Sequence, residues 1–178
     1  MISIKPQDIV VLAKLISRRG DESWTQHGIA AELCLSPSQV NYALKRLLTA
    51  GLMCPTLPPG KPIPIIHACE EFFLHGFKYV FPAQLGASTR GVPTSYAAPS
   101  FNGEIVIGND PIPVWPYAEG TERGAAVQPL HSSVPKSISK YPDPVFYAIL
   151  SLLDAIRIGR ARERAIGKQK LSELLKIK

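Results

Sequence analysis

The sequence predicts a mainly helical α+β protein, with helices near both ends of the chain and a small amount of β-structure between them. Apolar residues recur at helical spacing in residues 1–51 and 143–178. Fifteen of the 17 prolines lie between Pro55 and Pro144, where they argue against helix interiors and central strands. Aromatic residues are nevertheless frequent there, so we expect extended stretches and short strands that pack on a core.

Composition narrows the class of protein. The 178 residues are 46% hydrophobic and 19% charged, which is enough apolar material for a core. No apolar run reaches the ~18 residues of a membrane span, and Asp8 and Lys14 interrupt the apolar start, which does not fit a signal peptide. Three scattered cysteines suit reduced thiols better than disulfides: Cys34, Cys54 and Cys69. We therefore expect a cytoplasmic protein without a membrane partner.

The net charge of +6 is unevenly distributed. It amounts to +2 in residues 1–51, −2 in residues 52–156 and +6 in residues 157–178. Because the basic excess lies mainly in the C-terminal segment, the net charge does not by itself indicate a nucleic-acid partner.

Three helices are predicted in the first 51 residues. The first begins at Pro6 and ends in a C-cap at Gly20. Its apolar positions form a broad buried face: Ile9, Val10, Leu12, Ala13 and Ile16. Thr25 is the expected N-cap of a short second helix, "QHGIAAEL", and Ser36-Pro37 starts a third helix, which Gly51 closes.

The third helix, in "SPSQVNYALKRLLTAGLM", has two chemically distinct faces. One face is apolar: Val40, Ala43, Leu44, Leu47 and Leu48. The other is polar: Ser38, Gln39, Asn41, Tyr42, Lys45 and Arg46. The preceding residues fit a helix-turn-helix, because Ala30 lets two helices cross closely and Leu33 and Leu35 flank a tight turn at Cys34. Such spacing lets the polar face enter a DNA major groove about 12 Å wide.

The stretch resembles the winged helix-turn-helix of MarR-like bacterial regulators, over about residues 9–66. The resemblance rests on these residues: Leu33, Leu35, Ser36, Pro37, Ser38, Val40, Ala43 to Leu47, and Ala50 to Leu52. Cys34 occupies a turn position that is usually glycine, since the backbone there is left-handed. The resemblance implies a β-hairpin wing in "LMCPTLPPGKPIPII" with Pro59-Gly60 at its tip, which the prolines predict to be short or irregular. It also implies a two-fold homodimer.

On this interpretation, residues 1–66 form a domain that binds double-stranded DNA. Contacts to base edges or phosphates are expected from Ser36, Ser38, Gln39, Asn41 and Tyr42. Salt-dependent phosphate contacts are expected from Lys45, Arg46 and Lys61. An alternative stays open, in which the same helices form a hairpin with a solvated polar face or contact another protein.

Residues 67–142 form a Pro-rich segment with a short helix expected around His67–His75, packed on the domain or on a partner. Arg90 is expected in an exposed loop, as an anion contact or an ordinary loop arginine. Possible metal ligands are scattered, so no metal is predicted: Cys54, His67, Cys69 and His75. The sequence has no phosphate loop, dinucleotide fingerprint or nucleophile motif, so we predict neither an enzyme nor a cofactor.

Residues 143–178 are predicted to form a basic helix that begins at Asp143 and bends near Gly159 or Gly167. Its buried positions are Phe146, Ile149, Leu150, Leu153 and Ile156. Six basic side chains are expected either to contact the DNA backbone or to be simply solvated: Arg157, Arg160, Arg162, Arg164, Lys168 and Lys170. A possible dimerisation seam consists of Ile156, Ala161, Ala165 and Leu171.

The whole chain therefore predicts a sequence-specific transcriptional regulator. Three further stretches resemble bacterial winged-helix proteins described as regulators, a resemblance that supports the architecture alone: "GFKYVFPAQLGASTRGVPTSYAAP", "PVWPYAEGTERGAAVQPL" and "LLDAIRIGRARERAIG". The alternative is an antitoxin-like or adaptor protein that binds a second protein and also controls its own operon. The long extended segment rich in aromatic residues suits that alternative.

Overall fold

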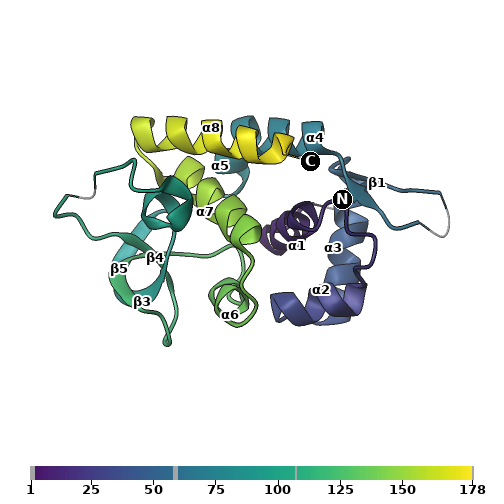
Figure 1. Ribbon diagram of the computed structural model, residues 1–178, viewed down its shortest axis with the longest axis horizontal. Coiled ribbons are helices and arrows are strands. Elements are labelled where there is room, and N and C mark those ends of the chain that lie inside the picture. Colours follow the sequence, from purple (N-terminus) through teal and green to yellow (C-terminus); the bar gives the residue numbers. More distant parts are fainter. Residues whose placement is uncertain (1–2, 58–59, 107, 178) are drawn as a thin grey trace.

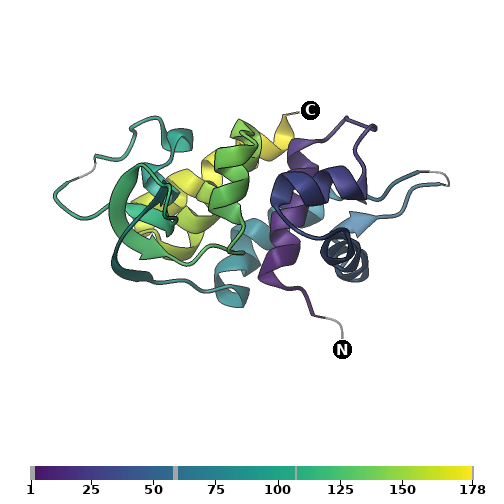
Figure 2. The same ribbon diagram turned by 90° about the horizontal axis from the view of Figure 1, so that it is seen from below.

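The computed structural model describes residues 3–57, 60–106 and 108–177 and shows an elongated molecule (Figure 1). Three N-terminal helices and a two-stranded ribbon lie at one end, and a small three-stranded barrel lies at the other (Figures 1 and 2). Two C-terminal helices, α7 (Pro144–Ile158) and α8 (Ala161–Lys176), lie between these two ends. The expected α+β class is confirmed.

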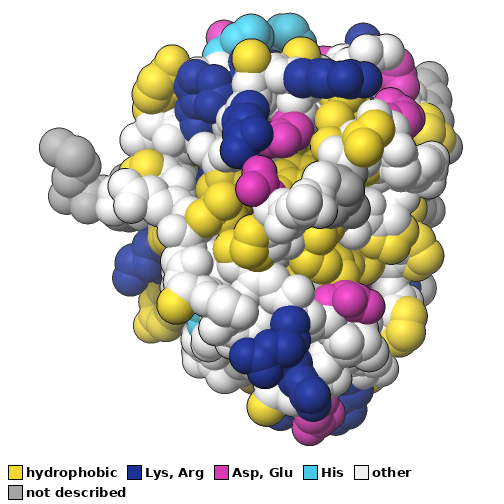
Figure 3. All heavy atoms as spheres, turned by 90° about the vertical axis from the view of Figure 1, so that its left-hand side faces the viewer, with side chains coloured by type: hydrophobic (Ala, Val, Ile, Leu, Met, Phe, Trp, Pro, Cys, Tyr) yellow, Lys and Arg dark blue, Asp and Glu magenta, His cyan; other side chains and the backbone are white. Residues whose placement is uncertain are grey.

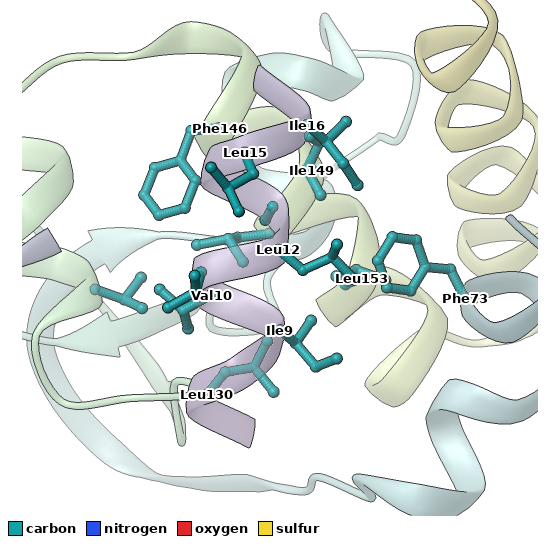
Figure 4. Packing of buried hydrophobic residues seen from close by; sticks show 14 of the residues in the cluster. Ile9, Val10, Leu12, Leu15, Ile16, Phe73, Leu130, Phe146, Ile149 and Leu153 are labelled. Carbon is teal, nitrogen blue, oxygen red and sulfur yellow. The ribbon is translucent and has the colours of Figure 1, made fainter. Parts of the chain in front are cut away.

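Helix α1 (Pro6–Ser17) lies in the middle of the hydrophobic core. Every residue from Asp8 to Ile16 is buried, so the helix is enclosed on all sides rather than on one broad face. Figure 4 shows aromatic and aliphatic side chains of other elements around it. The C-cap of this helix is Arg18 and not Gly20 as predicted. Gly20, with φ of +89°, lies beyond the helix end, where it supplies a left-handed turn.

Helices α2 (Gln26–Leu33) and α3 (Pro37–Thr49) have the predicted bounds and caps. Thr25 caps α2 and Ser36 caps α3, each through a side-chain oxygen that accepts a backbone N–H. Between them, Cys34 has a left-handed backbone with φ of 53° and ψ of 41°. The tight turn expected at this residue is therefore confirmed.

A short antiparallel ribbon follows α3. Its strands, β1 (Met53–Cys54) and β2 (Ile63–Pro64), pair over two residues each. The neighbouring prolines limit the ladder because they lack a backbone N–H. Of the expected hairpin tip, Gly60 is described, whereas Pro59 lies outside the described residues.

One helical stretch runs from Ile66 to Val80 and is longer than the short helix predicted around His67–His75. It consists of α4 (Ile66–Glu71), the π-helical turn η1 (Phe72–Gly76) and α5 (Phe77–Val80). Four phenylalanines on and just after it pack with ring centroids 5.5 to 6.4 Å apart: Phe72, Phe73, Phe77 and Phe81. This aromatic cluster anchors the stretch to the core and extends the helix.

The barrel consists of β3 (Leu85–Pro93), β4 (Pro113–Pro116) and β5 (Glu122–Val127). Strand β3 pairs antiparallel with both other strands, and β4 pairs parallel with β5. The backbone of β5 comes very close to the segment before β4, and a glycine makes this possible. A Cβ atom on Gly124 would lie 1.9 Å from the backbone oxygen of Ile112. Shorter helices connect the parts of the fold: η2 (Ser95–Ala97), η3 (Pro99–Phe101) and α6 (Val134–Lys140).

The predicted C-terminal helix is two helices. Asp143 caps α7 by accepting the N–H of Phe146 at 2.9 Å, as expected. The chain breaks at Gly159, one of the two predicted positions, while Gly167 lies within α8 and packs closely against Ala155 of α7. The glycine at residue 167 therefore serves helix packing, since it has no Cβ between the two helices.

A single hydrophobic cluster draws residues from the segments 1–66, 67–142 and 143–178. Figure 4 illustrates this, with Leu12 of α1 near Phe73 from the middle segment and Leu153 of α7. The predicted buried residues of α7 belong to this cluster. None of the described helices is long and apolar enough to span a membrane.

Candidate nucleic-acid interface

The two predicted faces of α3 are both present. Val40, Ala43, Leu44 and Leu47 are buried against α1 and α2. The remaining predicted apolar position, Leu48, is only partly buried. This packing leaves the opposite side of α3 for contacts outside the chain.

Two pairs of side chains organise the exposed side of α3. The hydroxyls of Ser36 and Ser38 lie 3.0 Å apart. Tyr42 has 59% of its surface exposed, and the ammonium group of Lys45 lies 5.7 Å from the centroid of its ring. This cation–π contact keeps one aromatic ring and one positive charge together on the surface.

Gln39 has a structural role in addition to its predicted one. Its side-chain oxygen accepts the backbone N–H of Ser36 at 2.8 Å, while the backbone N–H of Gln39 donates to the Ser36 hydroxyl. These two bonds form a capping box, which holds the first turn of α3. The amide nitrogen of the Gln39 side chain is not needed for the cap and is left for an external acceptor.

The guanidinium group of Arg46, predicted as a phosphate contact, is paired with Asp8 inside the fold. Its Nε and Nη2 atoms donate to the two carboxylate oxygens of Asp8 at 2.7 and 2.6 Å. Asp8 is fully buried and Arg46 is 16% exposed, so the pair joins α3 to the start of α1. Hydrogen bonding to Asp8 raises the pKa of the Arg46 guanidinium, and this group stays charged inside the fold.

Lys61 also differs from the prediction of a wing residue that reaches a phosphate. Its ammonium group donates to the backbone oxygens of Glu22, at 2.7 Å, and Trp24 and lies over the Trp24 ring at 5.2 Å. Both acceptors are in the loop that leads into α2. Lys61 therefore fixes this loop beside the ribbon and places a positive charge near the first turn of α2.

A contact between α2 and α3 involves a residue that the sequence analysis missed. The side-chain nitrogen of Asn41 donates to the side-chain oxygen of Gln26 at 3.2 Å, and both residues are half-buried. Gln26 is the first residue of α2. No motif in the sequence identifies this partner, because the pairing depends on how the two helices cross.

Of the six residues of the predicted basic stripe, three arginines bind oxygens of the chain itself. The Arg157 side chain is only 5% exposed and donates to Asp154 at 3.1 and 2.6 Å, so it is unavailable as an anion contact. Arg164 donates to the backbone oxygen of Gly159 at 2.9 Å. Arg160 is exposed but pairs with Asp110 at 3.3 Å. Only Arg164 of these three lies within α8, and all three bind oxygens of the chain itself.

The barrel end of the molecule has mixed surface chemistry. Arg90 is not in a loop, as predicted, but in β3, where it pairs directly with Arg123 of β5. Figure 3 shows this end with basic and acidic side chains interspersed around an apolar area. Such a surface does not resemble the continuous basic patch of a nucleic-acid interface.

The predicted dimerisation seam is divided between two environments. Ile156 and Leu171 are buried within the chain, whereas Ala161 and Ala165 are exposed. Helix α8 packs on α7 and α4 through its buried side. The four residues therefore do not form one apolar face toward a second copy of the chain.

A buried lysine joins the N-terminal helices to α7. The ammonium group of Lys14 lies 2.8 Å from Glu32 of α2 and 2.8 Å from Asp143. Burial alone would raise the pKa of both acids, but hydrogen bonds and nearby positive charge outweigh it and lower the pKa of Glu32 and Asp143. Both acids are therefore held in the charged form.

The cysteines and histidines considered as metal ligands are dispersed. Cys69 is buried, its thiol lies 3.4 Å from the backbone oxygen of Leu52, and burial raises its pKa to about 12. His67 and His75 are exposed. In residues 3–57, 60–106 and 108–177, no three His, Cys, Asp or Glu side chains converge as metal ligands.

No protein-family model, curated protein or solved structure matches this chain. The surface chemistry of α3 is therefore the main guide to function. Its outer side carries hydrogen-bonding side chains and one exposed lysine, Lys45, on a helix that is supported by α1 and α2. Such a helix can bind another polar surface without any covalent chemistry.

Proposed function

We propose that the protein is a sequence-specific DNA-binding regulator that acts through a winged helix-turn-helix. The observation that carries the proposal is the combination of α2, a left-handed turn at Cys34, and α3 with a polar outer face. The short ribbon β1–β2 follows α3 in the order that a wing requires. A supported helix of this kind fits the width of the major groove.

The proposed contacts separate into two kinds. Base edges are read by hydrogen-bonding groups on the first two turns of α3, and phosphates are bound by charge. The contact set is Ser36, Ser38, Gln39, Asn41, Tyr42 and Lys45. Arg46 and Lys61 act indirectly, because the first holds α3 on α1 and the second holds the loop before α2.

The proposed regulator binds DNA as a homodimer on a two-fold symmetric site, as helix-turn-helix regulators commonly do. The copies would meet through a surface other than the buried part of α8. Sedimentation with and without DNA would distinguish a dimer from two independent monomers.

Fluorescence anisotropy on the DNA upstream of the protein's own gene, against scrambled DNA at two salt concentrations, tests the proposal. We expect tighter binding to the native sequence that weakens with salt. Lys45→Gln should weaken binding to both DNAs and reduce the slope of log affinity against log salt by about 1. Lys136→Gln is the matched control, since Lys136 is an exposed lysine on α6. Equal, weak binding to both DNAs would contradict sequence-specific recognition.

The second proposal is an antitoxin-like or adaptor role with a protein partner. Three exposed apolar residues near the end of α5 and the start of β3 favour it: Tyr79, Val80 and Leu85. They are 72%, 53% and 52% exposed, and exposed apolar surface is a common mark of protein interfaces. Purification of the protein from its own cells with a second protein in equal amount would support this role.

A further inference from the structure

The geometry of α2 and α3 limits how Asn41 can present its amide group. Asn41 lies in the second turn of α3, and its side-chain nitrogen donates one hydrogen to the oxygen of Gln26. The terminal torsion of an unrestrained Asn is broad and nearly two-fold, so its oxygen and nitrogen can exchange places. In the structure the bond to Gln26 restrains this rotation, because it holds the side-chain nitrogen of Asn41 toward the side-chain oxygen of Gln26.

The fixed amide retains one donor and one acceptor for another molecule. An NH2 group has two hydrogens, of which Gln26 takes one, and the oxygen of Asn41 has no partner among the described residues. Adenine offers an acceptor at N7 and a donor at N6 in the major groove, which matches this pair of groups. Guanine offers two acceptors, N7 and O6, so its O6 would face the amide oxygen.

We propose that Gln26 is a positioning residue that orients Asn41 to read an adenine. The inference rests on the proposed function, since it assumes that α3 enters the major groove. Gln26 does not itself read the base. It acts from α2, whose own position is set by the Thr25 cap and the left-handed turn at Cys34.

The inference is tested in two steps. Binding sites are first selected from a randomised duplex pool, and affinity is then measured on the selected site and on its adenine-to-guanine variant. The wild-type protein should prefer adenine at one position by about tenfold, within the range of a bidentate amide–base contact. Gln26→Met keeps the length of the side chain but removes the acceptor. It should reduce that preference to less than about twofold while leaving other positions unchanged.

Two further variants separate positioning from a general structural effect. Gln26→Glu keeps an acceptor for the Asn41 nitrogen and should retain the adenine preference, although its charge weakens binding to all DNAs. His27→Ala, at the exposed neighbouring position of α2, should bind like the wild type. Equal thermal midpoints for the Met variant and the wild type would show that the fold is intact.

The possible outcomes distinguish the inference from the proposed function. A wild-type protein without any sequence preference would overturn both. A wild-type protein that selects a site, together with a Gln26→Met variant that keeps the adenine preference, would overturn the inference alone. A uniform loss of affinity in that variant without loss of preference would also overturn it, because Gln26 would then be only structural.

Discussion

At the scale of single residues, the location of a basic side chain decides what it can do. Arg46, Lys61 and Arg157 were equivalent to Lys45 in the sequence, as positive charges at helical or loop positions. In the structure each of the three binds oxygens of the chain itself. Lys45 alone of these four keeps its charge for an external partner, with an aromatic ring beside it.

Removal of the Arg46 side chain should therefore affect stability before it affects binding. Arg46→Ala leaves the carboxylate of Asp8 buried without its cation, which costs about 3–5 kcal/mol of unfolding free energy. Urea unfolding followed by circular dichroism would measure this loss. The matched control is Lys45→Ala on the same helix, which should change stability by less than about 0.5 kcal/mol. If Arg46→Ala were as stable as the wild type and only weakened DNA binding, Arg46 would be a phosphate contact after all.

At the scale of elements, the barrel depends on glycines at its closest strand contacts. Strands β4 and β5 lie parallel and both pair with β3, which brings three backbones together in a small space. Gly91, Gly120 and Gly124 each have a neighbouring backbone atom within 2.3 Å of where a Cβ would lie. A side chain at these positions requires the strands to separate.

Gly124→Ala should therefore destabilise the protein by about 3 kcal/mol or more, because the new Cβ would overlap the backbone oxygen of Ile112. Differential scanning calorimetry would detect the shift in melting temperature. Gly108→Ala makes the same chemical change in open space, with no atom within 4 Å, and should melt like the wild type. Equal melting temperatures for both variants would show that the barrel is not closed in solution.

At the scale of the whole molecule, one buried cation links parts that are far apart in the chain. Lys14 in α1 is bound to Glu32 at the end of α2 and to Asp143 at the start of α7. It also lies 5.2 Å from the ring centroid of Phe146. The orientation of the N-terminal helices relative to α7 therefore depends on charges as well as on apolar packing.

Acid should weaken this linkage. The folded pKa values of Glu32 and Asp143 are below their ordinary values. The two acids therefore contribute fully to the free energy of unfolding above their unfolded pKa values, and this contribution is lost as pH falls through their folded pKa values. We expect the urea midpoint to fall between about pH 5 and pH 3. Lys14→Met fills similar space without the charge, and its midpoint should be lower at neutral pH but depend less on acid. Identical pH profiles would show that Lys14 does not hold these acids.

Much of the fold could be predicted from local signals. The caps at Thr25, Ser36 and Asp143, the turn at Cys34 and the break at Gly159 all follow from the conformations that these residues favour next to their neighbours. The barrel, the π-helical turn and the full burial of α1 were not predictable, because they arise from packing between segments distant in the sequence.

The same limit applies to the candidate interface. The polar face of α3 is readable from the sequence because helical periodicity alone sets it. The partners Asp8 for Arg46 and Gln26 for Asn41 are not, because they come from other helices. The expected DNA contacts and the dimer stay predictions.

By itself, therefore, the sequence determined the bounds of α2 and α3, the start of α7 and the apolar side of α3, since those properties depend on residues within about one turn of each other. Only the tertiary structure decided which polar groups are already satisfied. That outcome depends on partners brought together by folding, and a buried charge must find one. Arg46 and Lys45 are neighbours in sequence, yet the first is fixed inside the protein and the second faces outward.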